Sequence, residues 1–540
     1  MLFNAPEFLV GFLPVVLAVF FLIGAFGRPV WAILWLVAAS LFFYGWWRPE
    51  FVLLILGSAA FNYLVGVQLG KQSSRALLTF GIAGNLAILG WFKYSGFLAL
   101  TIDELSGAGL PIPHVILPLG LSFYTFQQIA YLVDASSGAA RETNLPRYLL
   151  FVTFFPQLIA GPIVHHREML PQFHRQETYS PKLSNLLLGL TAFSIGLFKK
   201  VFIADPLGPQ AHLAYGPAAD GVVPMFGDAW FGTLAYTLQL YFDFSGYSDM
   251  AVGLGLMFGI RLPINFASSF KSPSIIEFWS RWHMTLTRFL TAYIYNPIAM
   301  SVARRRVAAG KPLLRPKSPQ ALPFAMQVAM PTILTMGLAG IWHGAGWQFL
   351  VFGLYHGVLL AINHAWRALR HVFGARSSYG PAGYVVAVLV TFLAVNISLV
   401  FFRADSLGHA LLILQAMAGE GGHFHGVVSR VGANLEAMGA IRQLAWRFST
   451  NGGILLIVGF FIVWALPNTT QLMERIAGEA KAQPKAARPV VRWPLLRWDR
   501  PAAIALRSQF LQGSCIGILL ALAVLRVVSV APTEFLYFTF

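Results

Sequence analysis

Apolar segments about 20 residues long dominate the chain and alternate with short polar stretches. These segments lie near residues 8–26, 30–47, 51–70, 76–99, 115–133, 148–164, 184–204, 229–242, 324–342, 345–363, 382–402, 452–467 and 513–531. An α-helix of about 20 apolar residues is long enough to cross the hydrocarbon core of a bilayer. The pattern predicts an all-α, polytopic integral membrane protein with roughly 11 to 14 transmembrane helices.

Two shorter apolar segments, 250–260 and 275–298, suit re-entrant or interfacial helices around the membrane core. Longer polar stretches appear only toward the end of the chain. We therefore expect a transmembrane core over 1–410, interfacial or cytoplasmic segments over 411–510 with one membrane span near 452–467, and a C-terminal transmembrane helix over 511–540.

Composition and charge support a membrane protein. Charged residues make up 11% of the chain, against about 25% in soluble domains. The net charge of +17 comes from basic residues in short stretches between apolar segments, which is typical of cytoplasmic loops beside anionic lipid. The alternation of charge predicts an N-terminus on the outer side. No basic soluble domain is visible, so we expect membrane lipids and no nucleic acid as partners.

The strongest basic cluster is "ARRRVAAGKPLLRPK" at 303–317, which we expect on the cytoplasmic side. It is either a plain positively charged loop or a site for an anionic acyl donor.

A first polar constellation interrupts the apolar pattern at "YFDFSGYSDM". It contains Asp243, Ser245, Tyr247, Ser248 and Asp249. Ionisable residues at membrane depth usually face a protein interior or a water-filled cavity. The glycines at 246, 253 and 255 would allow backbones to approach closely. The constellation is either substrate-binding or a hydrogen-bonded helix break that holds the bundle together.

A second constellation is "EFWSRWHMTLTRFL". On one helix, His283 and Thr287 would be stacked at i and i+4, and Arg281 and Arg288 would share a face. Such a pair of arginines suits phosphate or carboxylate, and the tryptophans at 279 and 282 suit the membrane interface. The alternative is an interfacial helix whose basic face binds lipid headgroups.

The third constellation is "WHGAGW", which places His343 between Trp342 and small residues. Burial keeps an isolated imidazole neutral, and a neutral imidazole can take a proton from a hydroxyl. His343 is therefore either a catalytic base or a histidine that packs one helix against another.

Other histidines suggest metal ligands less convincingly. They are His165, His166 and His174 in one segment and His423 and His425 in another. Neither set is accompanied by cysteines or a Glu-x-x-His helix. We expect no metal site and no bound cofactor.

Several blocks resemble the membrane-bound O-acyltransferase family, in its bacterial branch that includes the alginate O-acetyltransferase membrane subunit and the D-alanyl transfer protein of teichoic acid synthesis. The blocks are "LPLGLSFYTFQQIAYLVD" (117–134), "FVTFFPQLIAGPIVHHREMLPQF" (151–173), "GLFKKVFIAD" (196–205), "YFDFSGYSDMAVGLGLMFGI" (241–260), "FWSRWHMTLTRFL" (278–290), "IWHGAGWQFLVFGLYHG" (341–357) and "FFRADS" (401–406). They follow the family's order, and the resemblance as a whole runs from about residue 1 to 410.

The resemblance implies helices around a tunnel in the bacterial inner membrane, and an acyl thioester donor, acetyl-CoA, on the cytoplasmic side. It implies that His343 is the catalytic base and that His283 orients or polarises a reactant. We expect the substrate-binding side chains to be Asp243, Ser245, Tyr247, Asp249, Arg281, Trp282, Arg288 and Trp342. The acceptor would be an exported or cell-envelope polysaccharide, and a periplasmic hydrolase-like protein would complete transfer.

The sequence departs from this branch after the Arg-Trp-His motif. Thr291 and Ala292 stand where the branch has an Arg-Asp pair, so the acceptor stays open. Acylation of a lipid or a small secreted molecule is the alternative within the enzyme class. A proton-coupled transporter is the alternative from another class, because buried Asp and His residues also serve proton relays.

Overall fold

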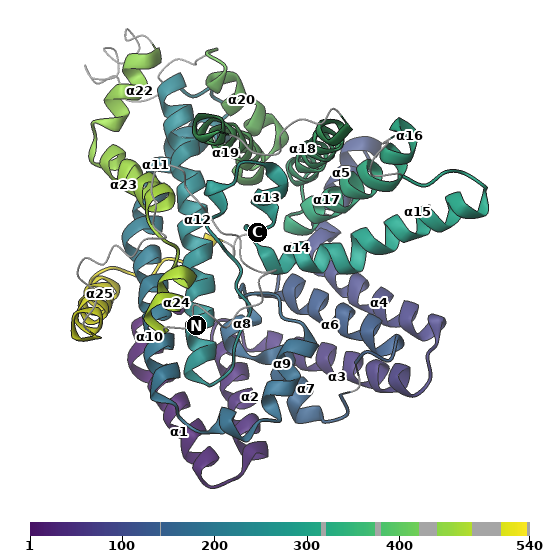
Figure 1. The fold of residues 1–540 in the computed structure, drawn as a ribbon, viewed down its shortest axis with the longest axis vertical. Coiled ribbons are helices and arrows are strands. Elements are labelled where there is room, and N and C mark those ends of the chain that lie inside the picture. Colours follow the sequence, from purple (N-terminus) through teal and green to yellow (C-terminus); the bar gives the residue numbers. More distant parts are fainter. Residues whose placement is uncertain (141, 315–319, 373–379, 421–439, 478–508, 537–540) are drawn as a thin grey trace.

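The computed structural model describes residues 1–140, 142–314, 320–372, 380–420, 440–477 and 509–536. These residues form helices joined by short loops, and no strand occurs among them (Figure 1). The predicted all-α polytopic class is confirmed. Much of the expected polar region, including 421–439 and 478–508, lies outside the described residues.

The first half of the chain contains the α-helices up to the longest one, α12. They are α1 (Leu13–Ala25), α2 (Pro29–Gly45), α3 (Glu50–Lys71), α4 (Arg75–Leu89), α5 (Ser95–Ser106), α6 (Leu121–Ser136), α7 (Leu145–Thr153), α8 (Phe155–Leu158), α9 (His166–Phe173), α10 (Leu183–Phe198), α11 (Asp205–Ala219) and α12 (Phe226–Met257).

The second half continues with shorter helices and then long apolar ones. They are α13 (Ile275–Trp279), α14 (Met284–Leu290), α15 (Asn296–Ala308), α16 (Ala321–Phe324), α17 (Met330–His343), α18 (Trp347–Val372), α19 (Pro381–Arg403), α20 (Leu407–Met417), α22 (Ala440–Phe448), α23 (Asn451–Ala465), α24 (Thr469–Ala477) and α25 (Gln509–Ser529).

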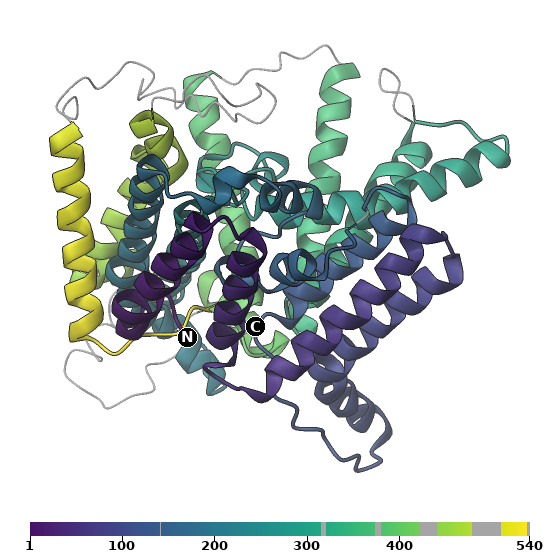
Figure 2. The same ribbon diagram turned by 90° about the horizontal axis from the view of Figure 1, so that it is seen from below.

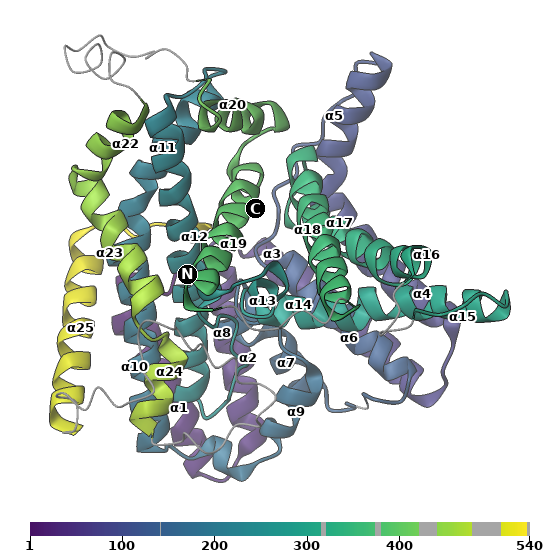
Figure 3. The same ribbon diagram turned by 45° about the horizontal axis from the view of Figure 1, so that its top comes forward.

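Short π-helical and 3₁₀ turns extend or join these helices. The π turns are η1 (Glu7–Phe12), η2 (Gly90–Tyr94), η4 (Lys199–Ala204), η6 (Thr291–Tyr295) and η7 (Ala325–Ala329), and the 3₁₀ turns are η3 (Gln176–Tyr179) and η5 (Ser269–Lys271). Figure 3 shows α15 and α5 extending outward from the body of the molecule.

Within the described residues, seven helices are long and apolar enough to cross a membrane, or eight if the bent pair α23 and α24 is one span. This number is smaller than the predicted 11 to 14. One reason is length, because α2 has 17 residues and α6 has 16. The apolar pattern of the sequence does not show where a helix ends. In the structure, turns interrupt several of the predicted apolar segments.

Helix α12 runs alongside the continuous segment formed by α10, η4 and α11 (Figure 1) and is buried along most of its length. Its glycines let α10 approach closely, as the sequence predicts. A Cβ atom on Gly253 would lie 2.5 Å from the carbonyl oxygen of Gly189. Any larger residue there would push the two helices apart.

A buried cation connects α12 to both ends of the chain. The ammonium of Lys200 lies 2.8 Å from carboxylate oxygens of Asp205 and Asp243, and it donates to the backbone carbonyl of Glu534. Asp243 also accepts from the backbone N–H of Leu536. Asn4 donates to the carbonyl of Thr533, so the first residues of the chain lie beside the described segment that follows α25 (Figure 2).

Replacing Lys200 by Met should destabilise the protein by about 3–5 kcal/mol, because Asp243 would remain buried without its cation. The measurement is the thermal unfolding midpoint of the purified protein in detergent. Lys182→Met is the control, since Lys182 pairs with Glu177 on the surface. Equal midpoints for the two variants would show that the buried cluster is not structural.

Candidate active site

His343 is the last residue of α17 and is 7% exposed. Gly344 follows in extended conformation and ends the helix, and a Cβ atom there would collide with the ring of Phe349. The imidazole contacts the edges of the rings of Trp342, Phe352 and Phe402. The end of the helix thus places the imidazole among aromatic rings, two of which, Phe352 and Phe402, lie outside the motif.

His283 lies at a backbone break between α13 and α14. Its φ is 44°, a left-handed conformation that is uncommon for a residue with a side chain. The prediction that one helix carries Arg281, His283 and Arg288 on shared faces is therefore wrong. The short helices α13 and α14 are separate, and the turn between them buries His283 to 1% exposure.

Asn265 fixes the orientation of His283. Its Oδ1 lies 3.0 Å from Nδ1 of His283 and also accepts from the N–H and the hydroxyl of Thr285. Its amide nitrogen donates to Ser248. Because Oδ1 is an acceptor here, Nδ1 of His283 carries the proton and Nε2 has the lone pair in the neutral ring. No motif in the sequence distinguishes Asn265 in "LPINF".

The structure brings His283 and His343 into one site, although they come from separate motifs. The ring of Phe123 stacks on His283 at 6.5 Å between centroids and contacts Trp342 at 5.5 Å. His343 interacts electrostatically with His283, Lys93 and His356. These side chains form the candidate active site.

Lys93 is the member of this site that sequence reasoning missed. Its ammonium donates to the backbone carbonyls of Trp342 at 2.5 Å and His343 at 3.0 Å. Lys93 belongs to η2, a π turn of the kind often found at functional sites. The signal in the sequence is a lone lysine within the apolar segment 76–99.

His356 lies next to the site, where its ring contacts Phe352, a neighbour of His343. The indole N–H of Trp279 donates to Nδ1 of His356, which leaves Nε2 to donate to the hydroxyl of Ser398. Trp279 and Trp282 are 6% and 8% exposed, so the expectation that they lie at the membrane interface is wrong. Trp282 instead packs against aromatic rings, including Phe278 at 5.5 Å.

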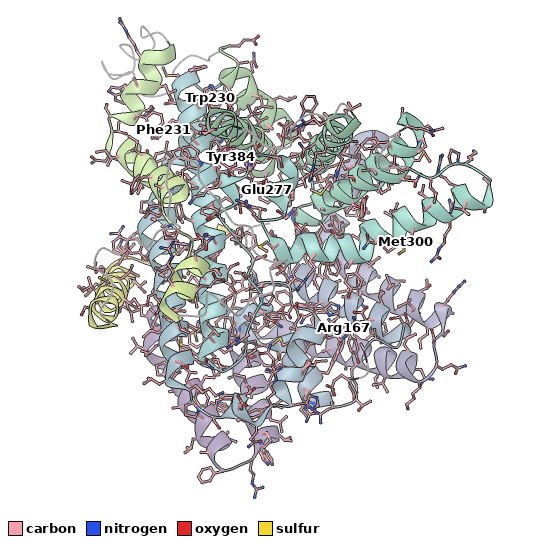
Figure 4. All side chains as sticks on the ribbon, viewed as in Figure 1. Arg167, Trp230, Phe231, Glu277, Met300 and Tyr384 are labelled. Atoms are coloured by element: carbon pink, nitrogen blue, oxygen red, sulfur yellow. The ribbon has the colours of Figure 1, made fainter. Side chains whose placement is uncertain are left out.

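The two predicted anion-binding arginines do not converge. Arg281 is 2% exposed and pairs with Glu277, which lies on α13 near the middle of the molecule (Figure 4). Arg288 pairs with Glu168 on α9. Each guanidinium therefore already has a carboxylate partner from this chain, and a joint site for one phosphate does not form.

The constellation on α12 lies within a continuous helix and not at a helix break. Its carboxylates are matched by lysines: Asp243 pairs with Lys200, and Asp249 lies 2.6 Å from the ammonium of Lys199. Ser245 and Tyr247 are buried on the same helix. None of these four residues lines the cavity beside His343, so their arrangement favours the structural alternative.

A separate histidine cluster lies at the end of α6 and the start of α9. Ligand atoms of Asp134, His165 and His166 lie within 4.8 Å of one another, and a cavity of about 320 Å³ adjoins Asp134, His165 and Tyr293. This spacing could hold a metal ion. However, the N–H of Arg167, labelled in Figure 4, donates to Nδ1 of His165, so its Nε2 carries the proton that a metal would replace.

The charges of this cluster fit a hydrogen-bond network. Burial, together with the neighbouring His165, lowers the pKa of His166 to about 4. Burial of Asp134 acts to raise its pKa, but hydrogen bonds from His165 and Tyr293 outweigh this and hold it below its usual value. His174 lies apart, 3.9 Å from Glu142, and His423 and His425 lie outside the described residues.

Comparison with known proteins identifies the family of this chain. Residues 123–309 match the model of the membrane-bound O-acyltransferase family. The chain is 40% identical to the peptidoglycan O-acetyltransferase of Helicobacter pylori, over 78% of this chain and 80% of the relative. It is 35% identical to the probable alginate O-acetylase of Pseudomonas aeruginosa, over the whole of both chains.

A more distant relative is the teichoic acid D-alanyltransferase of Bacillus subtilis, 28% identical over 46% of this chain and 59% of the relative. The relatives that match over most of the chain are O-acetyl transfer proteins, and the helices long and apolar enough to cross a membrane agree with a multi-pass protein. The chain is a multi-pass membrane enzyme that belongs to the membrane-bound O-acyltransferase family.

Proposed function

We propose that the enzyme transfers an acetyl group from acetyl-CoA on the cytoplasmic side of the bacterial inner membrane to a hydroxyl of an exported or cell-envelope polysaccharide. The proposal is supported by relatives named peptidoglycan O-acetyltransferase and probable alginate O-acetylase. A periplasmic hydrolase-like protein would be the partner that completes transfer. Acetyl-CoA is a substrate in this proposal, and no resident cofactor is required.

The observation that carries the proposal is the convergence of His343 and His283 in one buried site. An acceptor hydroxyl adds to the thioester carbonyl carbon, and His343 takes its proton as the new C–O bond forms. The carbonyl oxygen becomes negative. The C–S bond then breaks, the carbonyl re-forms, and the thiolate leaves and takes the proton from the imidazolium.

His283 has a different role from His343. With Nδ1 donating to Asn265, its Nε2 can accept a hydrogen bond from a reactant and orient it. The aromatic rings around both histidines, including Phe123 and Phe244, exclude water. This exclusion matters because water would hydrolyse the thioester.

Replacing His343 by Ala should reduce ester-linked acetyl in one polymer by about 100-fold or more, because the base is lost. The measurement is the acetyl content of exopolysaccharide and cell envelope at matched membrane expression. Loss from one polymer would identify the acceptor. Unchanged acetylation of every glycan, with the protein present and folded, would contradict the polysaccharide proposal and direct the search to lipids and small molecules.

Replacing Asn265 by Ala should reduce acetylation by about tenfold or more, since a partner that orients an active-site imidazole contributes on this scale. Ser248→Ala is the matched control, because it removes only the bond to the amide nitrogen of Asn265 and should stay within about twofold of the wild type. Full activity of a folded Asn265→Ala protein would show that the tautomer of His283 is unimportant.

A further inference from the structure

Lys93 places an amine, which is a cation when protonated, beside the backbone of His343. Among the described residues, no ion pair includes Lys93, whereas Lys199 and Lys200 each pair with a carboxylate. A cation inside an apolar bundle is costly when no carboxylate balances it. An anion that comes from a bound substrate would therefore stabilise the Lys93 cation at this position.

Two backbone carbonyls hold the ammonium in place. They belong to Trp342 and His343, at the C-terminal end of α17, where the helix dipole favours a cation. An ammonium has three N–H groups, so these two bonds leave one for a further acceptor. The hydroxyl of Tyr94 caps the same helix end by donating to the carbonyl of Ile341.

Lys93 and His343 line the same small cavity. Its volume is about 30 Å³, and the segment 117–123 and Trp342 complete its wall. A space of this size accepts a water-sized group such as a carbonyl oxygen. The wall is fixed, because Gly120 has a φ of 70° and a Cβ atom there would lie 2.7 Å from the carbonyl oxygen of Leu158.

Trp342 also lines this cavity. Its indole N–H is buried, and it has no hydrogen-bond acceptor among the residues that the structure describes. The cavity is thus lined by a histidine, a lysine and a tryptophan that carries an unused N–H donor. This set matches the needs of acyl transfer, in which one group takes a proton while others stabilise the charge that develops on the carbonyl oxygen.

We propose that Lys93, assisted by the indole N–H of Trp342, stabilises the oxyanion that forms when the acceptor hydroxyl adds to the thioester carbonyl. This inference rests on the proposed function and assigns a further catalytic residue to the same reaction. The oxyanion accepts a hydrogen bond from the ammonium while His343 holds the proton. When the C–S bond breaks, the negative charge passes to the leaving thiolate and Lys93 returns to its original state.

The competing explanation is that Lys93 only caps α17, as Tyr94 does. Charge and hydrogen bonding can be separated by substitution. Lys93→Gln keeps an N–H donor for the carbonyls but removes the charge, and Lys93→Arg keeps the charge. Tyr94→Phe removes a neutral cap from the same helix end and serves as the matched control.

The experiment measures the initial rate of thiol release from acetyl-CoA, and ester-linked acetyl in the polymer, with membranes that contain equal amounts of each full-length variant. Lys93→Gln should lower kcat by about 100-fold with KM changed by less than about threefold, because the oxyanion exists only after substrate binds. Lys93→Arg should retain more activity than Lys93→Gln, and Tyr94→Phe should retain at least about half. A Lys93→Gln enzyme with at least half of the wild-type kcat would overturn the inference.

Chemical rescue provides a second test if Lys93→Gln fails to fold. Cys515 is the one cysteine of the chain, so Lys93→Cys can be made in a Cys515→Ala background and treated with aminoethyl methanethiosulfonate, which restores a cation. Activity should rise about tenfold or more with this reagent and stay low with neutral methyl methanethiosulfonate. Equal effects of the two reagents would overturn the inference.

His343→Ala separates the two proposals. If this variant still acetylates the polymer, the proposed function of His343 fails, whatever Lys93 does. If His343→Ala is inactive and Lys93→Gln is fully active, only the role of Lys93 fails.

Discussion

Charge inside the apolar bundle is costly unless an opposite charge or a polar partner balances it, and this requirement connects segments that are far apart in the sequence. Lys200 joins α12 to the C-terminal segment through Asp243 and the backbone of Glu534. Lys199 and Asp249 meet Thr469 of α24. Where water cannot solvate a polar group, an intramolecular partner must do so. These contacts define which helices can be neighbours.

The same constraint shapes the active site. Both proposed catalytic histidines lie where a helix begins or ends: His283 precedes α14 and His343 ends α17. Backbone groups at such ends need partners. Asn265 supplies them around His283, since it bonds the backbone of Met284 and Thr285 as well as the imidazole. Lys93 supplies them at the end of α17. The residues that satisfy the backbone also position the chemistry.

The sequence predicts those features of the fold and the site that depend on neighbouring residues, and it does not predict those that depend on contacts between distant segments. Apolar segments give the all-α membrane class, and the motifs around His283 and His343 mark both histidines. The turn at His283 could not be predicted, because its left-handed backbone is stabilised by Asn265, 18 residues away. The salt bridge of Arg288 with Glu168 joins residues 120 positions apart. Residue spacing along one helix therefore gave the wrong geometry for the arginines.

The two histidine groups of the protein differ in a way that indicates different roles. His165 and His166 lie beside the carboxylate of Asp134, which belongs to the same hydrogen-bond network. The lining of the cavity beside His343 contains no carboxylate among the described residues, and its cation is Lys93. In a Ser-His-Asp triad the enzyme provides the negative charge that balances the imidazolium. In the site of His343 that charge would come from the substrate, as the carbonyl oxygen becomes an oxyanion between the imidazolium and Lys93. Proton transfer and addition to the carbonyl would then have to occur together, because the imidazolium has no carboxylate partner in the lining of this cavity and depends on the oxyanion for a negative charge.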